Sequence, residues 1–140
     1  MNDGQLQHWD GWVLTSVIYA SRNAESATLT DIIAAADWLN HAIISRGELE
    51  TGCARLIRAG HLKKTAEGFA ATDPVKLFWQ KKCSKVRSAH KTWEAVARHI
   101  GAPAWDPGLP DTKDELHVTE ADYAASLREY HHNTRRPKTK

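Results

Sequence analysis

The sequence has only two cysteines, and it has no apolar segment long enough to cross a membrane. Cys53 and Cys83 match no metal-ligand spacing, and two cysteines do not make the disulfide framework of a small secreted protein. The longest apolar stretch, residues 12–20, contains Thr15 and Ser16 and is far too short to span a bilayer. The N-terminal residues show no basic segment followed by an apolar core, so we expect no signal peptide and a cytoplasmic protein.

Motifs of the common enzyme classes are also missing. The sequence contains no nucleophile elbow, no phosphate-binding glycine loop and no HExxH motif. His90 and Glu94 would share one face of a helix, but a single pair of this kind is typical of a surface contact. His131 and His132 have only Glu129 as a nearby acid, which is little support for a metal site. We therefore predict a protein that is not an enzyme and uses no cofactor or metal.

What the sequence does have is the composition of an ordinary globular domain. Its 140 residues are 41% hydrophobic and 26% charged, and they include six Trp, a residue that usually marks a core or an interface. A chain of this length buries enough surface to fold without a disulfide or a metal. The net charge of +2 hides an uneven distribution, because residues 61–100 hold nine basic side chains against three acids, whereas residues 1–60 hold four against seven.

Three segments of residues 1–60 are predicted to be helices. The first runs from about residue 9 to 22 and has one apolar face. The second runs over residues 31–40, with Thr30 as its N-cap after a short extended stretch. The third begins at a capping box formed by Ser45 and Glu48, and it ends at Gly60, which has the position of a left-handed C-terminal residue. Its apolar positions are Leu49, Cys53, Leu56 and Ile57.

Two short strands and a long helical stretch are predicted next. Residues 61–65 and 69–71 form a hairpin with a glycine in the turn, and Asp73 followed by Pro74 resembles an N-cap and the first helical position. Residues 75–100 then predict a long helix, with Cys83-Ser84 as the place for a break. Four of its residues recur at intervals of seven and form a seam: Trp79, Val86, Trp93 and Ile100. Such a seam packs against another helix, which belongs either to the same chain or to a second copy in a homodimer.

The C-terminal part has three predicted segments. Residues 101–118 are a proline-rich connector, because three of the five prolines lie within residues 101–110, which cannot be helical. Residues 119–132 predict a last helix, and residues 133–140 predict a basic, disordered tail. The inner face of the last helix carries Tyr123, Leu127 and Tyr130.

The order of helix, short strand, helix, tight turn, helix and hairpin resembles the winged helix-turn-helix superfamily. Residues 28–72 carry the resemblance, and its most specific part is LETGCARLIRAGHL at residues 49–62. Many bacterial winged-helix regulators have a similar pattern of a leucine, Arg-Leu and Gly-Leu where the recognition helix leads into the wing. The resemblance implies a mainly α fold with a small β-hairpin wing, in which residues 1–74 are the winged-helix core and the rest is a helical extension.

Within this superfamily the chain is distantly similar to regulators of the MarR and PadR kind. It also resembles a set of small uncharacterised bacterial winged-helix proteins. That likeness is carried by Thr-Leu-Thr-Asp-Ile-Ile at residues 28–33, Trp-Asp-Pro-Gly at residues 105–108 and Tyr-His at residues 130–131. It implies no particular activity.

A DNA-binding winged helix places its third helix in the major groove and its wing on the backbone. With the apolar positions of the third helix facing inward, its opposite stripe would face solvent and carry arginines. We therefore predict a DNA-binding protein, a transcriptional regulator, that contacts double-stranded DNA through Arg46, Thr51, Arg55, Arg58, Lys63 and Lys64.

Two features favour a different function. Glu48 and Glu50 lie in the first turns of the third helix, where a carboxylate would repel phosphates, and the isoelectric point near 8.6 is low for a strong DNA binder. The alternative is a non-enzymatic protein-interaction module that keeps the winged-helix scaffold and binds a protein partner through its Trp-rich helix and C-terminal segment.

Overall fold

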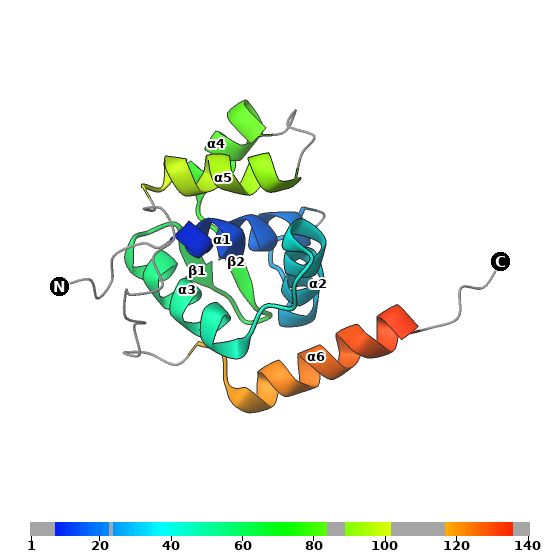
Figure 1. The fold of residues 1–140 in the computed structure, drawn as a ribbon. Helices are drawn as coiled ribbons and strands as arrows, with labels where there is room; N and C mark the ends of the chain where they lie inside the picture. Colours follow the sequence, from blue (N-terminus) through cyan, green and yellow to red (C-terminus); the bar gives the residue numbers. More distant parts are fainter. Residues whose placement is uncertain (1–7, 23, 84–88, 102–116, 136–140) are drawn as a thin grey trace.

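The computed structural model describes residues 8–22, 24–83, 89–101 and 117–135. They form six α-helices, one π-helical turn and one antiparallel hairpin (Figure 1). The predicted fold class, mainly α with a small β-hairpin wing, is confirmed. No helix of this part of the chain is long and apolar enough to cross a membrane. In chain order the elements are α1 (His8–Ala20), α2 (Leu29–Asn40), α3 (Arg46–Arg58), β1 (Leu62–Lys64), β2 (Phe69–Ala71), α4 (Asp73–Phe78), the π-turn η1 (Trp79–Cys83), α5 (Ala89–His99) and α6 (Glu120–Arg135).

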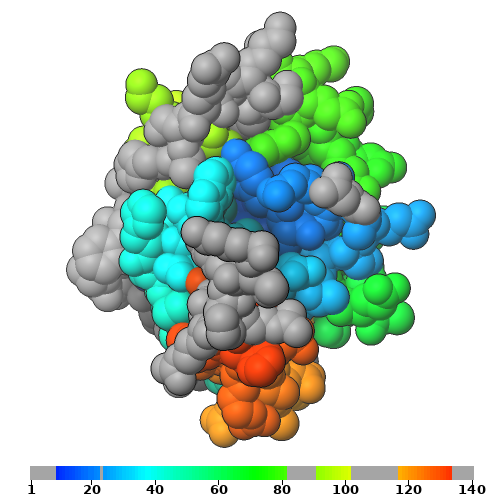
Figure 2. All heavy atoms as spheres, turned by 90° about the vertical axis from the view of Figure 1, so that its right-hand side faces the viewer, coloured from blue at the N-terminus to red at the C-terminus, as the bar shows by residue number. Residues whose placement is uncertain are grey.

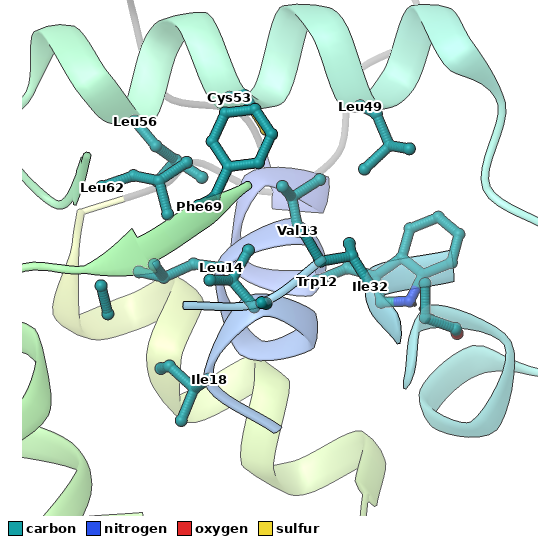
Figure 3. Close-up of a cluster of buried hydrophobic side chains, with 14 of the residues drawn as sticks. Trp12, Val13, Leu14, Ile18, Ile32, Leu49, Cys53, Leu56, Leu62 and Phe69 are labelled. Atoms are coloured by element: carbon teal, nitrogen blue, oxygen red, sulfur yellow. Dashed lines mark hydrogen bonds between the residues drawn. The ribbon is translucent and has the colours of Figure 1, made fainter. Parts of the chain in front are cut away.

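Helix α1 lies at the centre of the molecule, in contact with α2, α3, α5 and β2. Residues 10–18 are all buried, so α1 is enclosed on every side and not only on the one face that its sequence predicted. Gly11 permits the close crossing with α5, because a Cβ at this position would lie 2.5 Å from the Cβ of Ala97. Side chains from α1, α2, α3 and the hairpin meet in one core (Figure 3).

The ends of α2 and α3 are fixed by local hydrogen bonds. Thr28, and not Thr30, is the N-cap of α2, since its hydroxyl accepts a hydrogen bond from the backbone N–H of Asp31. At α3 the predicted capping box of Ser45 and Glu48 is confirmed, with both reciprocal bonds present. Gly60 has a φ of 83°, the left-handed conformation that the sequence predicted after α3.

The hairpin of β1 and β2, which we call the wing, has the predicted position. Leu62 pairs with Ala71 and Lys64 with Phe69, and Phe69 also exchanges backbone hydrogen bonds with Ala27 just before α2. Gly68 is required in the turn, because a Cβ there would lie 1.9 Å from the carbonyl oxygen of Ala27. The wing is thus tied to the start of α2.

Within the predicted helical stretch over residues 75–100, the structure has α4, which leads directly into η1, and then α5. The predicted place for a break, Cys83-Ser84, coincides with the end of η1, and residues 84–88 lie outside the described residues. Helix α4 also begins earlier, with Thr72 rather than Asp73 as its N-cap and Pro74 in the second helical position. The predicted seam packs within the chain: α5 lies against α1, Trp93 and Ile100 are buried there, and Trp79 contacts Tyr19 of α1. Val86 lies outside the described residues.

Helix α6 extends from the body and packs along α2 (Figure 1). It ends at Arg135, so the first residues of the predicted disordered tail are helical. Its inner face is the predicted one, since three of its side chains pack against the core. They are Tyr123, Leu127 and Tyr130. Most of the predicted connector, residues 102–116, and the end of the tail, residues 136–140, lie outside the described residues.

Candidate functional site

The middle of α3 is buried on all sides. The side of α3 opposite its apolar face was predicted to expose arginines to solvent, and in the middle of the helix it does not. Every residue from Leu49 to Leu56 is buried, including Thr51, which is 5% exposed, and Arg55, which is 0% exposed. The prediction that these two side chains face solvent was wrong. The apolar spacing correctly identified the face of α3 toward the core, but it carries no information on what covers the opposite face.

Arg55 is covered because it forms an ion pair with the first turn of α1. Its Nε and Nη2 donate to the two carboxylate oxygens of Asp10 over 2.8 Å and 2.9 Å, and Asp10 is also 0% exposed. Helices α1 and α3 approach closely here, since a Cβ at Gly52 would lie 2.9 Å from Val13 and 3.3 Å from Asp10. Two parallel charge-assisted hydrogen bonds partly compensate the cost of removing both charges from water.

A second side of α3 is occupied by the residues that lead into α6. One carboxylate oxygen of Glu50 accepts hydrogen bonds from the backbone N–H groups of His117 and Val118, the latter over 2.6 Å. Arg46 completes the contact by donating from Nη1 to the carbonyl oxygen of Val118 over 2.7 Å. The two charged residues thus hold one short stretch of backbone, and Glu50 has a structural role that the sequence did not indicate.

Helix α6 continues this contact along α2. The Tyr123 hydroxyl donates to the carbonyl oxygen of Ile44 over 2.6 Å, and the Tyr130 hydroxyl donates to the Asp37 carboxylate. The hydrogen bond to Asp37, together with partial burial, raises the pKa of Tyr130 to about 12. We call residues 117–135 the C-terminal arm. Its contacts cover parts of α2 and of α3, the helix to which the sequence assigned DNA recognition.

The remaining predicted DNA contacts lie at the end of α3 and on the wing. Arg58, Lys63 and Lys64 are exposed, and the Lys64 ammonium lies 4.7 Å from the centroid of the Phe69 ring. Arg46 is half-buried. The structure therefore does not bring the six predicted residues to one solvent-facing surface.

An open groove lies between the end of α1 and the outer face of α2, at residues that were not among the predicted site residues. Its volume is about 640 Å³, and the indole of Trp38 beside it is 57% exposed. Figure 2 faces this side of the molecule, with α1 in blue and α2 in cyan. Trp38 contacts Tyr19 with the ring centroids 5.2 Å apart. We call this the α1–α2 groove, lined by Tyr19, Ala20, Arg22, Ala24, Asp31, Ala34, Ala35 and Trp38.

The signal for this groove was present in the sequence. Asp31, Ala34, Ala35 and Trp38 have the spacing i, i+3, i+4 and i+7, so they lie on one face of α2. That face is opposite to the apolar residues that pointed to the core. A tryptophan on the outer face of a helix marks an interface more often than a solvated surface.

The described residues contain no arrangement with obvious catalytic chemistry. Cys53 is fully buried, and burial raises the pKa of its thiol, so the thiol stays protonated and is shielded from solvent. Among the described residues, no cluster of three or more His, Cys, Asp or Glu side chains could hold a metal ion.

In comparisons with known protein families, with curated proteins and with solved structures, nothing matches this chain. Its function must therefore be inferred from its own residues.

Proposed function

We propose that the protein is a non-enzymatic protein-interaction module on a winged-helix scaffold, and that the α1–α2 groove is its binding surface. The observation that carries this proposal is the contrast between two faces. The centre of α3, which a DNA-reading protein would present to a duplex, is buried around its whole circumference, whereas the groove beside Trp38 is open.

The buried centre of α3 argues against base reading by this helix. A recognition helix reads sequence through side chains that reach base edges in the major groove. Exposing Arg55 for this purpose would separate it from Asp10, and breaking a buried ion pair typically costs about 3–5 kcal/mol. The C-terminal arm would also have to leave Arg46 and Glu50.

The groove has the features of a protein-binding surface. Trp38 is large, apolar and more than half exposed, and tryptophan is among the residues that contribute most to binding when they become buried in an interface. Tyr19 supports it from the side, and alanines form much of the remaining lining. Arg22 and Asp31 line the groove together with these apolar residues. Protein interfaces have a similar composition, with an apolar centre and a polar rim.

One observation favours a second candidate, sequence-independent binding of duplex DNA. Arg58, Lys63 and Lys64 are exposed at the end of α3 and on the wing. Lysines and arginines at such positions bind phosphates and release counterions, which makes the affinity strongly dependent on salt.

Affinity capture from a lysate of the source organism tests the proposed function, with Trp38→Ala as the variant and Ile43→Ala as its control. Ile43 is another large exposed apolar residue, 41% exposed, that does not line the groove. We expect proteins held by the wild type and by Ile43→Ala to be lost with Trp38→Ala. Equal capture by all three proteins would contradict the proposal.

Fluorescence anisotropy with random duplex DNA at low salt tests the second candidate. The interaction-module proposal predicts no binding that added salt removes. Salt-sensitive binding that disappears in the triple variant Arg58→Ala, Lys63→Ala, Lys64→Ala would establish the DNA function instead. Arg22→Ala is the matched control, since Arg22 is an exposed arginine that lies in the groove lining and belongs to neither α3 nor the wing.

A further inference from the structure

We propose that the partner in the α1–α2 groove is a second copy of this chain, packed about a twofold axis so that Trp38 of each protomer enters the groove of the other. This inference rests on the proposed function, because it specifies the partner of the same groove. Three properties of the groove support a self-complementary partner.

The first property is that one patch carries both a protrusion and a hollow. The Trp38 indole is 57% exposed, and the groove beside it has a volume of about 640 Å³ and a lining that includes four alanines. In a twofold interface the same patch is used on both subunits, so that residue i contacts residue j and residue j contacts residue i. A patch that contains both complementary shapes satisfies this requirement, and two indoles are buried in one association.

The second property is that the patch carries both signs of charge. Arg22 and Asp31 line the same groove, and both are exposed. A partner surface of a single sign would attract one of these residues and repel the other. A second copy related by a twofold axis brings Arg22 opposite Asp31 twice, and like charges do not have to meet.

The third property is the small size of the residues between the charged group and the indole on α2. Ala34 and Ala35 lie between Asp31 and Trp38 on one helical face, so no long side chain holds a second backbone away. Short side chains at a helix contact permit a small distance between the helix axes. The exposed face of α2 can therefore pack closely against α2 of the second copy.

Sedimentation equilibrium of the full chain over a range of concentrations tests the proposal. We expect a monomer–dimer equilibrium for the wild type. Trp38→Ala should raise the dissociation constant at least tenfold, while the control Ile43→Ala leaves it unchanged. A wild type that stays monomeric throughout would overturn the inference, and so would equal weakening by both substitutions.

Charge exchange tests the twofold pairing itself. Arg22→Glu and Asp31→Arg should each weaken self-association, because each places like charges opposite one another. Equimolar mixing of these two single variants should restore a dimer, since every facing pair is then of opposite sign. Failure of the mixture to associate, with both variants folded by circular dichroism, would contradict the pairing.

These results separate the inference from the proposed function. A monomeric wild type that still captures proteins in a Trp38-dependent manner would refute self-association and leave the interaction module standing. A monomeric wild type without Trp38-dependent capture would refute both.

Discussion

Arg55 and Asp10 are 45 residues apart in the chain, yet the guanidinium of one makes two hydrogen bonds to the carboxylate of the other, of 2.8 Å and 2.9 Å. Both side chains are excluded from solvent. The pair joins α3 to the first turn of α1 and removes from the surface one of the six residues that the sequence predicted to contact DNA.

Removal of Arg55 should destabilise the protein severely. Arg55→Ala leaves the Asp10 carboxylate buried without its partner, and we expect the free energy of unfolding in urea to fall by about 3–5 kcal/mol. Arg98→Ala at the end of α5 is the matched control, and its exposed side chain should matter by no more than about 0.5 kcal/mol. Equal effects of the two substitutions would show that the pair does not form.

The crossing of α1 and α5 should be sensitive to a single methyl group. Gly11→Ala would place its Cβ 2.5 Å from the Cβ of Ala97, so the helices must separate, and we expect a loss of about 1–3 kcal/mol. Gly47→Ala in the first turn of α3 meets no atom within 4 Å, and the helix propensity of alanine should make it neutral or stabilising. Thermal unfolding of both variants measures the difference, and a stabilising Gly11→Ala would refute the close crossing.

The attachment of the C-terminal arm should weaken at high pH. The hydrogen bond to Asp37 raises the pKa of Tyr130 from its ordinary value of 10.0 to about 12, so the folded protein favours the neutral phenol. The stabilisation is therefore complete below pH 10 and is lost as the pH rises toward 12. Titration of tyrosinate absorbance should show a late component that Tyr130→Phe removes. A wild-type titration without that component would exclude the bond.

Mild acid should destabilise the fold through His61. Burial lowers the pKa of His61 below its ordinary value of 6.5, and the charge of His99 lowers it further. The unfolded chain then binds this proton more readily than the folded one, so stability present above pH 6.5 is lost as the pH falls below it. Urea unfolding at several pH values should show a smaller loss for His61→Gln than for the wild type. An identical loss would remove His61 as the cause.

The parts of the fold that depend on neighbouring residues could be predicted from the sequence. Ser45 and Glu48 are three residues apart, and their capping box needs nothing beyond the first turn of α3. Gly60 is free to adopt a positive φ, and the two strands of the wing are joined by a short turn. Each of these features is determined within a few residues of chain.

The burial of α3 could not be predicted in the same way. The partner of Arg55 lies in α1, and the partners of Glu50 lie in the C-terminal arm, 67 and 68 residues away in sequence. Periodicity identifies the most apolar face of a helix, but it does not report whether other elements cover the polar face. An arginine and a glutamate on such a face have the same sequence pattern whether they are solvated or paired.

The α1–α2 groove could be predicted from the sequence only in part. The inward positions of α2 were evident, and they left Trp38 on the opposite face. The interval of seven from Trp79 to Ile100 predicted a seam elsewhere, and the residues of that seam that the structure describes pack within the chain, on or beside α1. What sequence could not provide was the second wall of the groove, because the end of α1 forms it.

The rate of hydrogen exchange at the Arg55 Nε–H is the most direct test of whether the middle of α3 is buried. Nitrogen-edited NMR detects arginine Nε–H groups that exchange slowly with water, and Arg98 at the end of α5 serves as an exposed reference. We predict a persistent Arg55 signal at neutral pH, unchanged by added duplex DNA, while the Arg98 signal exchanges rapidly. An Arg55 proton that exchanges as fast as that of Arg98, or an Arg55 signal that shifts when duplex is added, would contradict the buried pair on which the interaction-module proposal depends.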